Sequence, residues 1–255
     1  MTSPATGADI IDAREKAGLR NVDRLLPSQP VMRKLFADDA ADFHARLEAV
    51  LHSVLPHAAA DSRWDLELKP GVTYASLGSD LATLHFHQML IALAGIRNVL
   101  ELGTFIGIST LYLAEAVGPR GSVTTVERGE EFHAIACRNF ARNGMAERIH
   151  PLHDGAIEVL QRQAAGECRY EMILVDAAKE EYAAMLDPAL CCLAPGGLLV
   201  VDDIFMNGDT LNTHPVTNKG RGVQDLITRI KALAPDYRRV ILPMGNGILL
   251  VRKPG

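Results

Sequence analysis

The sequence has few aromatic residues, no excess of positive charge and no long apolar run. Aromatic residues make up 5% of the 255 residues, so stacking walls for a large planar ligand are not evident. The formal net charge is −5 and no Lys/Arg cluster offsets it, which argues against a nucleic-acid partner. No apolar run approaches the ~20 residues of a membrane-spanning helix, so we expect no membrane association.

Cysteine is also scarce. None of Cys137, Cys168, Cys191 and Cys192 forms a C-x-x-C pair, which disfavours a disulfide or zinc role and predicts reduced core thiols. The N-terminus lacks the charged-then-apolar order of a signal peptide. We therefore expect a cytoplasmic protein.

What the sequence does contain is a clear change of pattern near Arg97. The preceding residues predict helices, at Val31–Leu55 and at Leu81–Leu93, where apolar residues recur at helical spacing. Strand and helix patterns alternate from Arg97 onward, and the strands are almost continuously apolar, which is typical of a parallel sheet covered on both faces. Strands are predicted at Asn98–Leu102, Ser122–Glu127, Arg148–His153, Tyr170–Asp176 and Leu198–Asp202, with helices between them at Ser109–Val117, Glu131–Asn143, Ile157–Ala164 and Glu180–Leu193. This is the pattern of an α/β, Rossmann-like, doubly wound fold.

The C-terminal part departs from that alternation. A helix at Val223–Leu233 is followed by two apolar runs, Arg239–Leu242 and Ile248–Arg252, with a Gly/Asn turn between them. Such a turn predicts an antiparallel hairpin. The polar stretch Gly208–Gly222 reads as a long connection, which fits a mobile lid, although a stretch without function would look the same.

The strongest motif is Val99–Thr110, VLELGTFIGIST. An apolar strand ends near Glu101, Gly103 and Gly107 form a turn, and a helix follows. This order presents backbone N–H groups and a helix N-terminus to a bound cofactor. Glu127 ends the next strand, where a carboxylate can accept hydrogen bonds from both hydroxyls of a ribose.

Two cofactors fit that pattern to different degrees. A dinucleotide site expects G-x-G-x-x-G to hold a pyrophosphate, whereas this chain has E-x-G-x-x-x-G. The wider spacing favours a nucleoside without phosphates, such as S-adenosylmethionine. A nicotinamide-dependent oxidoreductase remains the alternative from another enzyme class.

Two later strands end in acids. Asp176 follows the apolar residues MILV of the fourth strand, and Asp202 and Asp203 follow the fifth. A single aspartate here would commonly cap the next turn. Three carboxylates at one sheet edge would repel one another, and a hard divalent cation such as Mg²⁺ would resolve that repulsion while leaving positions open for a substrate.

Together the segments LELGTFIGIST, VDAAKEEY, VDDIFMNG and MGNGILLVRK, with Glu127, resemble the cation-dependent O-methyltransferases of the catechol and caffeoyl-CoA type. The resemblance runs from about Ser79 to Lys253. It implies a class I S-adenosylmethionine-dependent enzyme with a seven-stranded sheet whose last strand is antiparallel. It also implies a methyltransferase domain over residues 76–255, preceded by an N-terminal helical segment, residues 1–75, that contributes to the acceptor pocket and to a homodimer contact.

The resemblance also assigns roles to individual residues. The implied cofactor contacts are Ser79, Glu101, Gly103, Thr104 and Ser109 at the methionine end, Glu127 at the ribose, Ala156 and Asp154 near the adenine, and Asp176. The implied metal ligands are Asp176, Asp202 and Asp203. Lys179 together with Asp176 is the implied catalytic pair, and Asn207 is the implied contact of a small hydroxylated, catechol-like acceptor.

The chain departs from the family pattern at three places. Asp203 stands where the family usually has asparagine, and Ala178 replaces an aspartate that contacts the cofactor. Thr83, Leu84 and His85 replace a glycine-rich approach to the sheet, which predicts an altered acceptor pocket. A metal-independent methyltransferase acting on another small molecule is therefore an alternative, as is a cofactor-binding module that has lost its catalysis.

Overall fold

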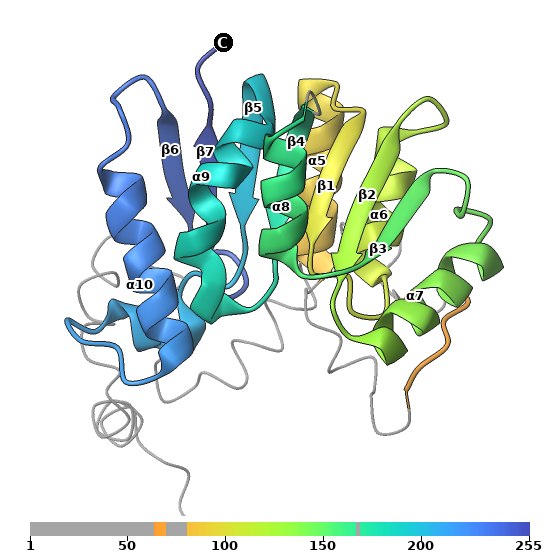
Figure 1. The fold of residues 1–255 in the computed structure, drawn as a ribbon, viewed down its shortest axis with the longest axis horizontal. Coiled ribbons are helices and arrows are strands. Elements are labelled where there is room, and N and C mark those ends of the chain that lie inside the picture. Colours follow the sequence, from red (N-terminus) through yellow and green to blue (C-terminus); the bar gives the residue numbers. More distant parts are fainter. Residues whose placement is uncertain (1–63, 70–80, 167–168) are drawn as a thin grey trace, which may run out of the picture.

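The computed structural model describes residues 64–69, 81–166 and 169–255, and its centre is a seven-stranded sheet in the order β3-β2-β1-β4-β5-β7-β6 (Figure 1). The strands are β1 (Asn98–Leu102), β2 (Ser122–Glu127), β3 (Ile149–His153), β4 (Tyr170–Val175), β5 (Leu193–Val201), β6 (Arg238–Leu242) and β7 (Ile248–Arg252). The helices described are α5 (Leu81–Ala94), α6 (Ile108–Val117), α7 (Glu130–Arg142), α8 (Ala156–Ala164), α9 (Tyr182–Cys192) and α10 (Asn218–Lys231), with the 3-10 turns η4 (Lys179–Glu181) and η5 (Met206–Leu211).

The central strands are parallel, as the apolar runs predicted. Strand β1 pairs in parallel with β2 and with β4, and residues 99–102 of β1 are all buried. The predicted C-terminal hairpin is confirmed, because β6 and β7 are antiparallel and β7 also pairs antiparallel with β5. The expected fold class is therefore confirmed.

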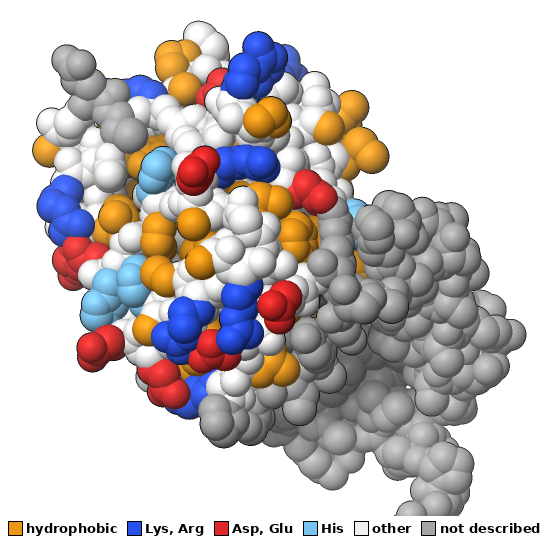
Figure 2. All heavy atoms as spheres, turned by 90° about the vertical axis from the view of Figure 1, so that its right-hand side faces the viewer, with side chains coloured by type: hydrophobic (Ala, Val, Ile, Leu, Met, Phe, Trp, Pro, Cys, Tyr) orange, Lys and Arg blue, Asp and Glu red, His pale blue; other side chains and the backbone are white. Residues whose placement is uncertain are grey.

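Two apolar cores enclose the sheet. One core holds side chains of α8, α9 and α10, which lie in front of the sheet in Figure 1, and includes Leu160, Met185 and Leu226. The other holds side chains of α5, α6 and α7 and includes Trp64, whose ring meets that of Tyr112 edge-on at 5.7 Å between centroids. On the face drawn in Figure 2, positive and negative side chains are mixed instead of gathering by sign.

The predicted long connection over Gly208–Gly222 is wrong. Its beginning lies in η5, and α10 starts at Asn218. The buried carboxylate of Asp209 holds the intervening chain, because it accepts hydrogen bonds from the backbone N–H of Val216 (2.9 Å) and Thr217 (3.1 Å) and from the hydroxyl of Thr217 (2.5 Å). The aspartate that reads as a loop residue in sequence is thus a buried anchor of the turn before α10.

The cysteines only partly follow the prediction of core thiols. Cys192 is buried, whereas Cys137 is half-buried and Cys191 is exposed; these three are free thiols. Cys191 and Cys192 are adjacent at the end of α9, so they point to different sides and cannot both enter the core. Cys168 lies outside the described residues, as do the predicted helix Val31–Leu55 and most of the predicted N-terminal segment. In the described ranges, no helix is long and apolar enough to span a membrane.

Candidate active site

The turn between β1 and α6, residues 103–107, is called here the glycine loop. Its backbone has positive φ at Gly103 (106°) and Gly107 (90°). A Cβ at Gly103 would lie 2.1 Å from the backbone carbonyl oxygen of Asp176, and one at Gly107 would lie 2.3 Å from the ring of Phe140. Glycine is therefore required at both positions, because the conformation and the close approach each exclude a side chain.

A cavity of about 380 Å³ opens at the carboxyl ends of the parallel strands, in the size range of small-molecule sites and at the place where α/β sheets bind ligands. Residues from the glycine loop and α6, from the ends of β2 and β3, and from the segments after β4 and β5 line it. They are Leu84, Gly103, Thr104, Phe105, Ile106, Ile108, Ser109, Val126, Glu127, Arg128, Asp154, Ala156, Asp176, Ala177, Ala178, Lys179, Glu181 and Asp203.

Glu127 is held in place by backbone donors. Its Oε2 accepts a hydrogen bond from the N–H of Phe105 (2.8 Å), and its Oε1 accepts one from the N–H of Gly129 (2.8 Å). Each carboxylate oxygen can accept further bonds. Glu127 is thus fixed in orientation and can still receive a pair of hydroxyl donors from a ligand in the cavity.

Glu101 supports the loop from behind and does not line the cavity. It is fully buried, and its Oε2 accepts hydrogen bonds from the hydroxyls of Thr125 (2.6 Å) and Thr110. Burial raises the pKa of Glu101 to about 7, although the hydroxyl donors oppose the shift. The hydroxyl of Thr125 also lies 2.6 Å from that of Thr104, so one buried network joins β1, β2, α6 and the loop.

Ala156 and Asp154, the two residues predicted to lie near the adenine, line the cavity. The Asp154 carboxylate already accepts from the N–H of Gly155 (2.7 Å) and pairs with Arg162 (2.6 Å). Hydrogen bonding from Arg162 is the main reason that the pKa of Asp154 is lowered. Ser109, on the first turn of α6, lines the cavity near the glycine loop.

Acidic residues and one lysine gather beside the glycine loop, on the segments that follow β4 and β5. The Lys179 ammonium pairs with both Asp176 and Asp203, at 3.0 Å from Asp203 Oδ2. Burial lowers the pKa of Lys179, but the two carboxylates outweigh it and hold that pKa above its usual value. Burial raises the pKa of Asp176, against the neighbouring lysine. Lys179 is therefore an ammonium clamped between two carboxylates, and not the lysine of lowered pKa that would serve directly as a base.

Asp202 lies deeper than its neighbours. It is 6% exposed, and its Oδ1 accepts from the backbone N–H of Asp203 (2.8 Å). Burial, followed by the charges of Asp176 and Asp203, raises the pKa of Asp202 to about 7. Asp203 itself has φ 61°, a left-handed conformation, and it lines the cavity. Asp176, Lys179, Asp202 and Asp203 are called the acid cluster below.

The donor chemistry of the acid cluster fits a hard divalent cation, since three carboxylates share one positive charge. The arrangement of the three side chains is less favourable for metal binding, because Lys179 lies between two of the three carboxylates. Within residues 64–69, 81–166 and 169–255, no set of three ligand side chains is disposed to hold a metal ion. A cation bound here would have to displace the Lys179 ammonium.

The structure thus brings most of the predicted site residues together. Gly103, Thr104, Ser109, Glu127, Asp154, Ala156, Asp176, Lys179 and Asp203 all line one cavity. Asn207 does not: it is exposed, and its N–H donates to the Asn246 side chain (2.7 Å). Ser79 lies outside the described residues.

Several cavity residues were missed by the sequence reasoning. Phe105 has φ 52° and its ring packs on that of Phe132 at 4.5 Å between centroids. Arg128 and Glu181 line the cavity and form an ion pair of 3.4 Å. The position of Arg128 directly after Glu127 was an available signal, whereas nothing local predicts the contact with Glu181. Of the three residues expected to alter the acceptor pocket, Leu84 lines the cavity.

Known proteins resemble this chain over the same region. A family model described as O-methyltransferase matches residues 71–254. Catechol O-methyltransferase of Niastella koreensis is 33% identical over 140 residues, which cover 53% of this chain and 63% of that protein, less than two thirds of its length. Caffeoyl-CoA O-methyltransferase 2 of Petunia hybrida is 30% identical over 176 residues, covering 66% of this chain and 73% of that protein. The crystal structure of the O-methyltransferase TomG from Streptomyces achromogenes, in complex with S-adenosylmethionine, superposes with a TM-score of 0.66 at 25% identity, covering 71% of this chain and 83% of that one.

Proposed function

We propose, because the chain belongs to the O-methyltransferase family, that it transfers the methyl group of S-adenosylmethionine to a hydroxyl oxygen of a small, catechol-like acceptor. The observation that carries the proposal is that residues of the glycine loop and of the acid cluster line one cavity. A methyl donor and a hydroxylated acceptor need such adjacent sites, since the oxygen must approach the methyl carbon to about 3 Å in line with the bond that breaks.

The glycine-loop end suits S-adenosylmethionine. The Glu127 carboxylate, fixed by two backbone N–H groups, would accept hydrogen bonds from the ribose hydroxyls. Gly103, Thr104 and Ser109 would surround the methionine end, and Ala156 would lie near the adenine. TomG, a similar protein, is recorded with this cofactor bound.

The reaction itself needs an oxygen nucleophile. The acceptor oxygen would form a bond to the methyl carbon while the carbon–sulfur bond breaks and its electron pair returns to sulfur, which leaves S-adenosylhomocysteine. The acceptor hydroxyl must lose its proton, and Lys179 is the nitrogen base in the cavity closest to the acids. It can accept that proton only after it has left the Asp176 and Asp203 carboxylates, because these hold it as an ammonium.

We further propose that Asp176, Asp202 and Asp203 hold a divalent cation such as Mg²⁺ during turnover. Such a cation, when bound, lowers the pKa of a coordinated hydroxyl and orients two vicinal oxygens. The carboxylates that it occupies would no longer pair with Lys179. This change would free Lys179 to act as the base.

A metal-independent methyltransferase is the second candidate, and one observation favours it. The Lys179 ammonium already pairs with two of the three carboxylates. In such an enzyme Lys179 would stay charged and would orient an acceptor through the acid cluster, which does not require a cation.

Transfer of a labelled methyl group from S-adenosylmethionine to catechol separates these possibilities. We expect transfer with Mg²⁺, its loss in chelator, and its loss in Asp176→Ala and Lys179→Ala. Undiminished transfer in chelator would reject the cation and leave the metal-independent enzyme. Undiminished transfer in Lys179→Ala would remove that lysine from the role of base.

A further inference from the structure

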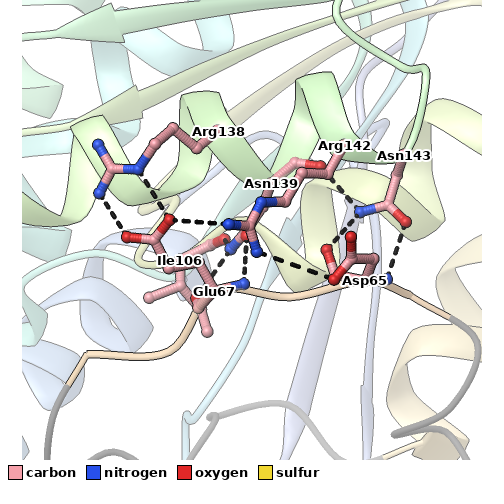
Figure 3. A network of polar contacts seen from close by, with 7 residues as sticks. All are labelled: Asp65, Glu67, Ile106, Arg138, Asn139, Arg142 and Asn143. Atoms are coloured by element: carbon pink, nitrogen blue, oxygen red, sulfur yellow. Dashed lines mark hydrogen bonds and ion pairs between the residues drawn. The ribbon is translucent and has the colours of Figure 1, made fainter.

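Residues 64–69, called here the strap, lie along α7 (Figure 3). Two asparagines of α7 hold its backbone. Asn139 Oδ1 accepts from the N–H of Glu67 (2.6 Å), and its Nδ2 donates to the carbonyl of Glu67 (3.2 Å). Asn143 repeats this pair one turn later with the N–H (3.0 Å) and carbonyl (2.9 Å) of Asp65.

Asn139 has a further bond that distinguishes it from Asn143. Its Nδ2 also donates to the carbonyl of Ile106 (2.9 Å), within the glycine loop, and the Asn139 side chain is fully buried. One amide therefore joins the strap, α7 and the loop. A buried amide must have its hydrogen bonds satisfied. Loss of the bonds to the strap therefore disturbs the bond to the loop, and the reverse.

The glycine loop needs such external support. Gly103, Phe105 and Gly107 all have positive φ, and for Phe105 this conformation is strained. The Ile106 carbonyl belongs to the peptide that enters Gly107, so the bond from Asn139 fixes the orientation of that peptide. Phe105 and Ile106 both line the cavity, and a rotated peptide would change its wall.

A second route leads from the strap to the same loop. The Lys69 ammonium lies 4.9 Å from the centroid of the Phe132 ring, and Phe132 packs on Phe105. The Arg138 guanidinium binds both carboxylate oxygens of Glu67 (2.9 and 2.6 Å) and secures the strap on α7. The strap is thus connected to the cavity wall at Ile106 and at Phe105.

We propose, resting on the proposed binding of S-adenosylmethionine, that Asn139 is a positioning residue that couples the strap to the cofactor site. The strap holds Asn139, Asn139 holds the Ile106 carbonyl, and the cofactor binds against the loop thus fixed. Binding of the cofactor and docking of the strap then strengthen each other, because coupling between two sites is reciprocal.

The two asparagines form a matched pair for the test. S-adenosylmethionine is titrated calorimetrically into the full-length parent, Asn139→Ser and Asn143→Ser. Each variant loses its bonds to the strap, but only Asn139→Ser loses the bond to the loop. We expect the cofactor Kd to rise by about tenfold in Asn139→Ser and by less than about twofold in Asn143→Ser. Equal affinities in the two variants would overturn the coupling.

Hydrogen exchange supplies a readout that simple destabilisation would not move. In the parent and in Asn143→Ser, S-adenosylmethionine should slow backbone exchange across the strap. In Asn139→Ser the slowing of the same amides at saturating cofactor should be much smaller, with only the contact through Phe132 left to transmit it. Slowing in Asn139→Ser equal to that in the parent would contradict the proposal.

Glu67→Pro covers the case in which Asn139→Ser does not fold. The proline removes the backbone N–H that donates to Asn139 Oδ1, at a position in the partly exposed strap. Glu67→Ala controls for loss of the ion pair with Arg138. The proline variant should bind the cofactor several-fold more weakly than the alanine variant. Equal binding would reject the coupling alone, whereas a parent that does not bind S-adenosylmethionine would reject the proposed function as well.

Discussion

At the glycine-loop end of the cavity, the ligand-facing carboxylate is held by neutral backbone donors, whereas at the acid cluster the carboxylates are held by a charge. Glu127 receives two N–H groups from fixed peptides. Asp176 and Asp203 share a flexible lysine side chain. The first arrangement is complete before a ligand arrives, and the second can be rearranged by another cation or by an acceptor. The difference indicates a preformed cofactor site beside a site that changes during turnover.

Gly103→Ala should have the largest effect, because Gly103 packs directly against the backbone of Asp176. The new Cβ would meet the Asp176 carbonyl oxygen at 2.1 Å in a backbone with φ 106°. We expect a loss of at least about 4 kcal/mol of unfolding free energy, measured by urea denaturation. Gly144→Ala is the control, since it has φ 65° with nothing within 4 Å and should cost only about 1 kcal/mol. Similar costs in the two variants would show that Gly103 and the backbone of Asp176 are not in contact as described.

Glu101→Gln tests whether the buried hydrogen-bond network around Glu101, behind the glycine loop, excludes water. Burial raises the pKa of Glu101 from its usual 4.5 to about 7 in the folded state. The unfolded chain therefore releases this proton at lower pH, and stability falls as pH rises from about 4.5 to about 7, by about 3 kcal/mol in all.

The measurement is urea denaturation of the parent and Glu101→Gln at pH 5 and pH 8. Burial lowers the pKa of His87 to about 4, so its contribution to stability rises with pH up to about 6.5. This contribution is the same in the parent and in Glu101→Gln and cancels when the two proteins are compared. The parent should lose more stability than the variant over this range, while Glu130→Gln, an exposed glutamate, should follow the parent. Parallel curves for the parent and Glu101→Gln would mean that water reaches Glu101.

Lys179→Met tests whether the acid cluster can exchange its cation. Removing the ammonium leaves Asp176 and Asp203 without their partner, so Mg²⁺ or Mn²⁺ should bind about tenfold more tightly than to the parent. Calorimetric titration measures this, with the exposed Lys219→Met as a control for net charge. An unchanged affinity would mean that the lysine and the metal do not compete for the same carboxylates.

Arg162→Ala should have the smallest effect. The Arg162–Asp154 pair is exposed at the rim of the cofactor end, where ion pairs contribute less than about 1 kcal/mol. The cofactor Kd should change by less than about twofold, and any change should vanish in high salt. A larger loss would show that Asp154 needs its arginine in order to bind the adenine.

The sequence predicted best what depends on local pattern. Apolar runs separated by helices located the strands, and the Gly/Asn turn located the hairpin, because neighbouring residues determine both. Gly103 and Glu127 were found for the same reason: strand ends and glycine turns have clear signatures. The convergence of Asp176 and Asp203 followed from the parallel order of the strands.

What the sequence could not give depends on contacts between distant segments. Nothing near Lys179 indicates that Asp203, in another strand connection, would clamp it and raise its pKa. Asp209 reads as a loop residue because its partners become visible only when the chain has folded around it. Asn139 looks like any polar residue of an amphipathic helix, and only the fold shows that its amide joins the strap to the glycine loop.

The most direct test of the account is calorimetric titration of the full chain with S-adenosylmethionine and, separately, with NADH. We predict that S-adenosylmethionine binds, that NADH does not, and that Glu127→Gln weakens the binding of S-adenosylmethionine by at least about tenfold. Binding of NADH without S-adenosylmethionine, or an unchanged affinity in Glu127→Gln, would contradict the assignment of this cavity to a methyl donor.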